Sequence, residues 1–112
     1  MSNNRKIDEF DCCAAFQALG NPHRLSIFLR LAKCCRMEVT CGLEAESICV
    51  GEIVDDLGIA PSTVSHHLKE LRQAGLIHMA RNGQQMECWV EPETLKRLSG
   101  FFKEVAPGLQ ID

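Results

Sequence analysis

The sequence lacks the features that would place it in a membrane, outside the cell or among the common enzyme classes. No apolar run approaches the length needed to cross a bilayer, and no hydrophobic stretch follows residues 1–6 to act as a signal peptide. We therefore expect a cytoplasmic protein. The sequence also has no Cys-x-x-Cys motif, no phosphate-binding loop and no carboxylate pair in a plausible cleft, so we do not expect an enzyme.

Low-complexity tracts, internal repeats and linkers are absent as well. The 112 residues therefore predict a single domain over residues 1–112, with a core from about residue 10 to residue 105. Charged residues make up 24% and apolar residues 46% of the chain, which is ordinary for a globular protein.

Residues 53–71 are the most informative stretch of the chain. They predict two helices joined by a tight turn at Gly58, the second opening at Pro61. Apolar side chains occur where two crossed helices bury a shared seam, at Val54, Leu57, Ile59, Val64, Leu68 and Leu71. The second helix keeps a polar outer face of Ser62, Thr63, Ser65, His66 and Lys69. Short or cationic hydrogen-bonding side chains of this kind contact phosphates and base edges in the major groove.

This stretch therefore predicts a helix-turn-helix with its recognition helix; the alternative is a helical hairpin whose polar face meets only water. The following residues favour the first interpretation. Gly75 is placed to end the helix, and Asn82-Gly83 separates two β-prone runs, residues 76–81 and 84–90, as in a hairpin with a type I′ turn. A recognition helix followed at once by a hairpin is a winged helix. Its tip would carry Arg81, Asn82, Gln84 and Gln85, within reach of sugar-phosphate or a minor groove.

An excess of basic charge is also lacking, since the net charge is -3. Residues 61–85 nevertheless hold three basic side chains against one acidic side chain, a net +2. A modest positive segment on an acidic body favours specific contacts made by two copies of the chain. The adjacent His66 and His67 diverge on one helix, so we assign them to DNA contact or packing rather than to a metal. The predicted DNA-contacting residues are Ser62, Thr63, Ser65, His66, His67, Lys69, Arg72, Arg81 and Gln84.

Helices are also predicted before and after this motif. The first covers about residues 7–19, and its predicted buried face is Phe10, Cys13 and Ala14. Asn21 caps the second, with Pro22 at its first position and an apolar stripe of Leu25, Phe28, Leu29 and Ala32. A loop over about residues 33–47 leads to the helix near residues 50–57, and Pro92 opens a last helix that ends near Val105.

The last helix has a stripe more apolar than a small core needs. Leu95, Leu98, Phe102 and Val105 repeat at helical spacing, with Phe101 beside them. We predict that the first and last helices form a homodimer interface with residues Phe10, Leu95, Leu98, Phe102 and Val105. The alternative is that these helices only cover the core.

The predicted fold is thus mostly α with a small β-hairpin, a winged helix-turn-helix in the order α-α-α-α-β-β-α. That order, with LGNPHRL at residues 19–25 and STVSHHLKEL at residues 62–71, resembles the ArsR/SmtB family of bacterial repressors over about residues 10–105. The resemblance implies a homodimeric transcriptional repressor that binds double-stranded operator DNA without a cofactor. It also implies release from the operator when an effector binds, often a metal or metalloid ion.

Seven cysteines are several times the ordinary number for this length. In a cytosolic protein they favour metal, metalloid or redox chemistry over structural disulfides. Thiolates suit arsenite, antimonite, Cd(II), Pb(II) and Zn(II), and three converging sulfurs suit the pyramidal metalloids best. The candidate ligands are Cys34, Cys35, Cys41 and Cys49, with Cys12 and Cys13 as the alternative. Cys88 alternates with Met86 and Val90 in the wing and is predicted to be a small core residue.

Two departures from the family narrow the choice of effector. Metal-responsive relatives carry ELCVCDL at the third helix, whereas residues 47–53 are SICVGEI, so the second cysteine of that site is Gly51 here. Residues 92–112 contain no histidine, which argues against the zinc site that relatives form on the last helix. Two alternatives stay open: a dithiol redox or persulfide sensor on the same fold, and cysteines that are only small buried side chains.

Overall fold

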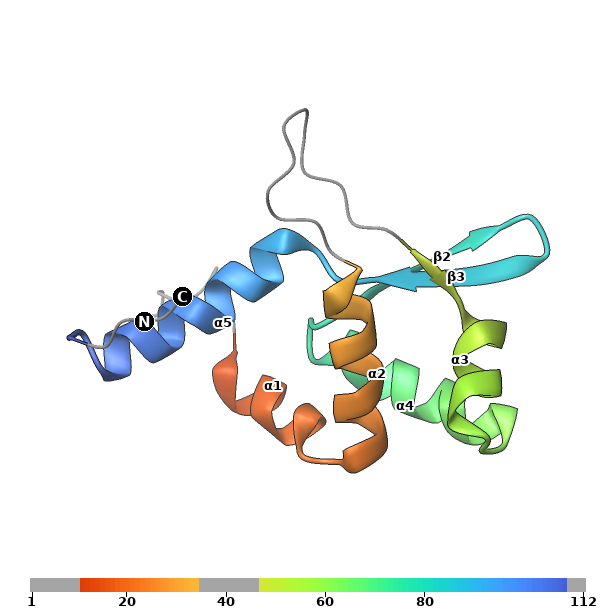
Figure 1. The fold of residues 1–112 in the computed structure, drawn as a ribbon, viewed down its shortest axis with the longest axis horizontal. Helices are drawn as coiled ribbons and strands as arrows, with labels where there is room; N and C mark the ends of the chain where they lie inside the picture. Colours follow the sequence, from red (N-terminus) through yellow and green to blue (C-terminus); the bar gives the residue numbers. More distant parts are fainter. Residues whose placement is uncertain (1–10, 35–46, 109–112) are drawn as a thin grey trace, which may run out of the picture.

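The computed structural model describes residues 11–34 and 47–108, and this part contains five helices and three strands (Figure 1). In chain order they are α1 Cys12–Leu19, α2 Pro22–Lys33, β1 Ile48–Cys49, α3 Val50–Leu57, α4 Pro61–Gln73, β2 His78–Asn82, β3 Gln85–Trp89 and α5 Pro92–Val105. The predicted winged helix-turn-helix is confirmed. The structure adds β1, a two-residue strand that the sequence pattern did not predict.

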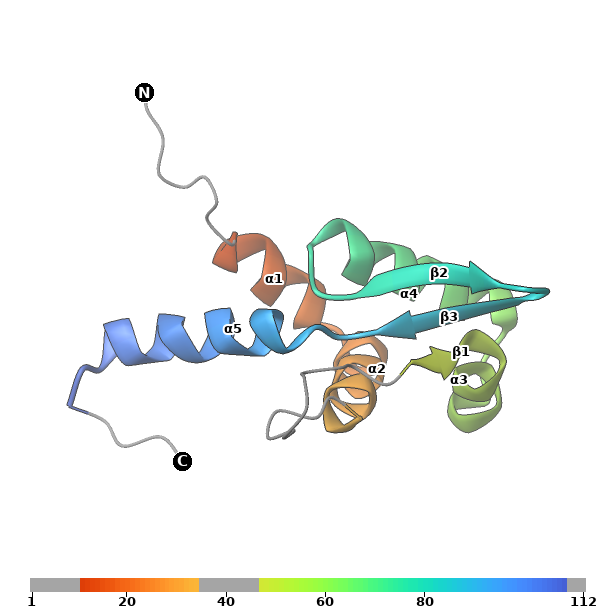
Figure 2. The same ribbon diagram turned by 90° about the horizontal axis from the view of Figure 1, so that it is seen from above.

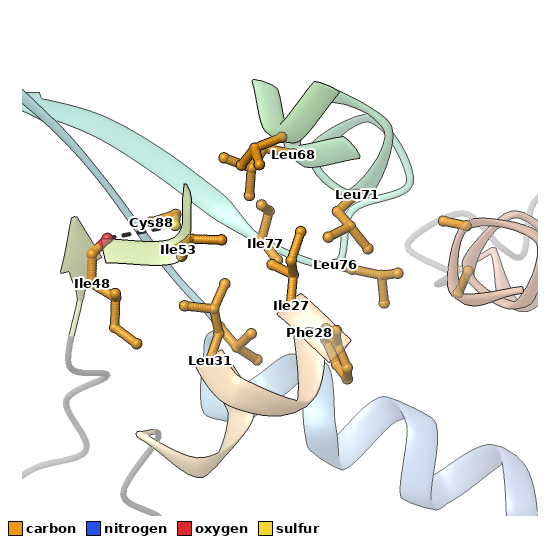
Figure 3. Packing of buried hydrophobic residues seen from close by; sticks show 14 residues of the cluster. Ile27, Phe28, Leu31, Ile48, Ile53, Leu68, Leu71, Leu76, Ile77 and Cys88 are labelled. Atoms are coloured by element: carbon orange, nitrogen blue, oxygen red, sulfur yellow. Dashed lines mark hydrogen bonds between the residues drawn. The ribbon is translucent and has the colours of Figure 1, made fainter. Parts of the chain in front are cut away.

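The core lies between α2, α4 and the sheet (Figure 3). Ile27 and Leu31 of α2 pack toward Leu68 and Leu71 of α4, and Leu76 closes the same cluster. Each of these side chains is almost fully buried. Burial of a leucine or isoleucine side chain contributes roughly 1.5–3 kcal/mol, so this layer holds the recognition helix onto the body of the domain.

Helix α2 begins as predicted, but its buried face differs from the predicted one. The Asn21 side chain accepts hydrogen bonds from the backbone N–H groups of His23 and Arg24, and Pro22 takes the first helical position. Phe28 is buried with Ile27 and Leu31, whereas Leu25 and Leu29 are exposed. Residues two apart on a helix diverge by about 200°, so a stripe containing Ile27 excludes Leu25 and Leu29.

Helix α1 also packs through different residues. Ala15 and Ala18 are its buried positions, Ala14 is half-buried and Cys13 is exposed. Ala15 and Ala18 form the face of α1 that packs against α2 and α4. Phe10 lies outside the described residues.

The helix-turn-helix follows the prediction at both of its glycines. Gly58 ends α3 with a φ of 67° and donates its N–H to the Val54 carbonyl at 3.0 Å. After α4, Gly75 has a φ of 79°, its N–H bonds to the Arg72 carbonyl, and the Leu76 N–H bonds to the Leu71 carbonyl. This pair of bonds is the Schellman pattern, and it places Leu76 in the core directly after the helix.

The wing is a hairpin, but its turn is shifted by one residue from the prediction. Asn82 pairs with Gln85, so the two-residue loop is Gly83-Gln84. Of these two loop residues, only Gly83 has a positive φ, 69°, since no non-glycine residue of the described chain has one. Glycine at the first loop position matches a type II′ turn, so the predicted type I′ turn over Asn82-Gly83 is wrong. The hairpin is antiparallel, and β1 joins it along β3 to give the strand order β1-β3-β2.

The last helix and the wing extend toward opposite ends of the molecule (Figures 1 and 2). Both views place the start of α4 at the same end as the tip of the wing. None of the helices described is both long and apolar enough to span a membrane.

Candidate nucleic-acid interface

The recognition helix α4 is divided cleanly into a buried and an exposed side. Val64, Leu68 and Leu71 are buried in the core. The exposed positions include the predicted DNA-contacting residues Ser62, Thr63, Ser65, His66, Lys69 and Arg72. The first turn of α4 contains no acidic residue and its N-cap Ala60 makes no side-chain cap, so the positive end of the helix dipole is left for a phosphate. This face presents hydrogen-bonding groups and positive charge without a competing carboxylate at its start.

His67 is the exception among the predicted contacts. Its side chain is only 7% exposed and lies against α2, where a guanidinium nitrogen of Arg24 is 3.4 Å from its Nδ1. Burial lowers the pKa of His67, and the nearby Arg24 lowers it further. Of the two roles that the sequence left open for this residue, the structure therefore supports packing, and His67 leaves the set of predicted DNA contacts.

The tip of the wing carries Arg81, Asn82, Gln84 and Gln85, all of them exposed. Asn82 donates a hydrogen bond to Glu87 at 3.1 Å, and the Gln85 Oε1 accepts one from the Cys49 thiol at 3.0 Å. These two side chains thus brace the strands of the wing. Arg81 and Gln84 are the two that the prediction assigned to DNA, and the structure places both on the outside of the hairpin.

An aromatic patch joins the two terminal helices and was only partly predicted. It consists of Phe16 on α1 with Phe101, Phe102 and Val105 on α5, and we call it the terminal patch. The Phe16 ring centroid lies 5.3 Å from that of Phe101 and 5.9 Å from that of Phe102. Phe102 and Val105 are 46% and 65% exposed, and Phe16 is 39% exposed. Apolar surface of this kind, spread over neighbouring helices, is typical of an interaction surface.

The other residues of the predicted dimer interface lie elsewhere. Leu95 and Leu98 are partly buried against the core. Phe10 is outside the described residues. Phe16 was missed by the sequence analysis, because the pattern of the first helix was aligned on Phe10 and Ala14 rather than on Ala15 and Ala18.

Two of the four predicted cysteine ligands lie on either side of residues 35–46, which the structure does not describe. Cys34 is the C-cap of α2, Cys49 is the N-cap of α3, and Cys35 and Cys41 belong to residues 35–46. Within residues 11–34 and 47–108, no three His, Cys, Asp or Glu side chains converge on a common point. The two cysteines of α1 differ in exposure, with Cys12 half-buried and Cys13 exposed. The predicted metal site therefore stays a prediction.

Cys88 is a core residue, as predicted. It is fully buried, and its thiol donates to the Ile48 carbonyl at 3.5 Å, a bond that connects β3 to β1 (Figure 3). Burial raises the pKa of the Cys88 thiol to about 12. The thiol therefore stays protonated at neutral pH, and thiolate chemistry at this position is suppressed.

Comparisons with known proteins agree with this geometry. Residues 35–78 match the model of a family described as bacterial regulatory protein, arsR family. The chain is 31% identical over 90 residues to an uncharacterized HTH-type transcriptional regulator of Methanocaldococcus jannaschii, an alignment that covers 80% of this chain and 89% of the relative.

Solved structures show the same fold. A crystal structure of an ArsR family transcriptional regulator superposes with a TM-score of 0.68 at 21% identity, covering 86% of this chain and 92% of the other. The solution structure of a homodimeric winged helix-turn-helix DNA-binding domain from Mycobacterium bovis, a possible ArsR-family transcriptional regulator, gives a TM-score of 0.63. The two chains are 25% identical, and the match covers 95% of this chain and 88% of the other.

Proposed function

Because the chain belongs to the arsR family and is a DNA-binding winged helix-turn-helix transcriptional regulator, we propose that it is a homodimeric, sequence-specific repressor. Members of this family regulate transcription and are not enzymes. The proposal adds three points to the family assignment: which side chains contact DNA, how two copies associate, and what releases them from the operator.

The observation that carries the proposal is the division of α4. Its apolar residues are all directed into the core, and Ser62, Ser65 and Lys69 are all directed outward. A surface helix without a ligand has no need to exclude acidic residues from its outer first turns. Insertion of this face into a major groove explains the composition, with the wing contacting the adjacent backbone through Arg81.

Selection of bound sequences from a random DNA pool tests specificity and symmetry together. We expect a consensus with two-fold symmetry whose half-sites are about one helical turn apart, since a two-fold dimer presents two recognition helices to one face of the duplex. Recovery of unrelated sequences, or of a single asymmetric half-site, would contradict the proposal.

The terminal patch supports association of two copies. Helix α5 projects beyond the body of the domain in both views, and its exposed Phe102 and Val105 belong to that projecting end of the helix (Figures 1 and 2). A second copy related by two-fold symmetry would cover both patches at once. The M. bovis relative is described as homodimeric.

For the effector, we propose a thiophilic ion, with trivalent arsenic preferred, bound by Cys34 and Cys35 together with Cys49 or Cys41. The hydrogen bond between Cys49 and Gln85 supports Cys49 as a ligand, because it connects this candidate ligand to the wing. A soft ion binds the thiolate and displaces the thiol proton to solvent, so Gln85 would lose its donor. Occupancy of the site would then release one of the braces that hold the wing.

The Cys34→Ser, Cys35→Ser double variant should therefore stay on the operator when arsenite is added. Wild-type protein should lose affinity by tens-fold, a coupling of a few kcal/mol at most, without unfolding. Fluorescence anisotropy of labelled operator, with and without arsenite, measures the difference. The Cys12→Ser, Cys13→Ser variant is the matched control, with the same number of thiols removed.

Each result of that titration has a distinct meaning. If the control variant resists arsenite and the Cys34, Cys35 variant does not, the ligands come from α1. If wild-type protein ignores arsenite but is released by an oxidant, or by a polysulfide that transfers a sulfane sulfur to the thiolate, the dithiol redox or persulfide alternative replaces ion binding. Mass spectrometry of the released protein would then show a disulfide or persulfide.

A further inference from the structure

A cluster of basic side chains connects α4 to α2 behind the DNA-contacting face. The buried His67 of α4 lies with its ring centroid 5.7 Å from that of His23 on α2 and 6.0 Å from that of its neighbour His66. A guanidinium nitrogen of Arg24 is 3.4 Å from the His67 Nδ1. Glu70, one turn further along α4, lies 4.0 Å from His66 and supplies the negative charge of the cluster.

Arg24 is itself fixed from the other side. Its Nε donates to the Ala18 carbonyl at the end of α1 at 2.6 Å. Beside this bond an open surface hollow of about 330 Å³ lies where α1, α2 and α4 meet, and Arg24 and Glu70 are among its lining residues. Arg24 thus connects its own helix α2 to α1 and to α4.

The chemistry of the contact fixes the protonation state of His67. A guanidinium has five N–H donors and no acceptor, so the Nδ1 of His67 must be the acceptor. Nδ1 accepts only when it is unprotonated, which makes His67 neutral with its proton on Nε2. Protonation of Nδ1 would remove the bond and place a second positive charge against Arg24.

We propose that Arg24 and His67 are a positioning pair that sets the orientation of α4 for DNA, and that the pair works only while His67 is neutral. Acidification would then loosen α4 from α2 and lower the affinity for DNA without removing any DNA-contacting group. This inference rests on the proposed role of α4 as the recognition helix.

The direction of the pH dependence follows from the groups that face His67. Burial, Arg24, His23 and His66 all lower the pKa of His67 from its ordinary value of 6.5, and Glu70 opposes them. Because the folded-state pKa is the lower one, the neutral ring stabilises the fold fully above pH 6.5. That stabilisation is lost as the pH falls through the folded-state value.

Two variants of His67 separate positioning from direct contact. Glutamine keeps an acceptor for Arg24 and does not titrate, whereas leucine removes the acceptor. At about pH 7.5, His67→Gln should bind operator within about threefold of wild type, and His67→Leu should bind about tenfold more weakly. The slope of affinity against salt should be the same for both, since neither variant removes a phosphate contact.

The pH profile supplies the second readout. As the pH is lowered from about 7.5 to the point where the fold begins to melt, the ratio of wild-type affinity to that of His67→Gln should fall by up to about tenfold, the loss expected for His67→Leu, because only wild type protonates this ring. Taking the ratio cancels all other titrating groups. The melting temperature of wild type should fall more on acidification than that of His67→Gln. His78→Gln, an exposed histidine on β2, should retain the full wild-type loss.

The proposal is overturned if the affinity ratio stays constant with pH, or if a folded His67→Leu binds as wild type does. If His67→Leu does not fold, the affinity ratio of wild type to His67→Gln and the melting temperatures of these two proteins still test the proposal. Lys69→Glu separates this outcome from failure of the proposed function. If Lys69→Glu binds DNA normally, α4 is not the recognition helix, while the melting data continue to report on the pair.

Discussion

Replacement of Ser65 and Lys69 together with glutamate should abolish operator binding while the chain stays folded. Both side chains are exposed on α4, each about 100° around the helix from the buried neighbour that precedes it, so the variant removes no core contact. A base-contacting side chain contributes about 1–3 kcal/mol of discrimination, and two new carboxylates would face the phosphates. We expect a loss of about 100-fold or more in a mobility-shift assay.

The matched control for this variant is Ser26→Glu with Lys96→Glu. It makes the same two types of substitution and the same change in net charge, at exposed positions on α2 and α5. Non-specific repulsion from DNA would therefore weaken both variants equally, while a specific interface would weaken only the α4 variant. Equal binding by the α4 variant and wild type would show that this face does not contact the operator.

The second large effect concerns the terminal patch. Phe102→Asp with Val105→Asp should convert a dimer into a folded monomer, because both side chains are exposed and neither belongs to the core. A monomer loses the effective concentration that joins two half-sites, so its operator affinity should fall by about 100-fold or more at physiological salt. Light scattering at micromolar concentration measures the mass, and circular dichroism confirms the fold.

Two controls isolate the interface from charge and from stability. Lys96→Gln with Arg97→Gln also lowers the charge of α5 by two but should leave the dimer intact. Leu98→Asp places a carboxylate on a side chain that packs against the core, so it should lower the melting temperature as well as the mass. Wild-type protein that scatters light as a monomer, yet binds the operator tightly, would contradict the dimer.

The features that sequence predicted best are those with local chemical signals. Gly58 and Gly75 mark the ends of α3 and α4 through a left-handed conformation, and Pro61 marks the start of α4 through its restricted φ. The observed end of α3 and both ends of α4 lie where these residues predict. Helix α5 runs over the predicted residues 92–105 because Pro92 marks its start and the apolar spacing is regular. In each case the residues that determine the helix end lie within one or two helical turns of it in the sequence.

The incorrect predictions depended on partners far away in the chain. The buried face of α2 is set by Leu68 and Leu71, which select Ile27 over Leu29 although both fit a helical pattern. The turn of the wing is set by pairing between β2 and β3, which moved it by one residue from Asn82-Gly83. Strand β1 has only two residues and exists because β3 offers an edge to pair with, a signal absent from the local sequence.

In the candidate site, helical spacing predicted the outer face of α4. It also fits the burial of His67, because Val64, His67, Leu68 and Leu71 stand at i, i+3, i+4 and i+7. Spacing does not identify the partner of His67, which is Arg24, 43 positions earlier in the chain. Similarly, Phe16 enters the terminal patch through Phe101 and Phe102 near the opposite end of the sequence.

The absence of a linker between α4 and the wing has a consequence for the DNA itself. Leu76 and Ile77 are buried directly after the Schellman turn, so helix and hairpin move as one body. A rigid body of this kind cannot adjust the distance between the groove that its helix enters and the backbone that its wing meets. The duplex must supply the fit through its own groove width and bending stiffness. Base pairs that no side chain touches would then contribute to operator choice, because their sequence decides how readily the duplex takes the required shape.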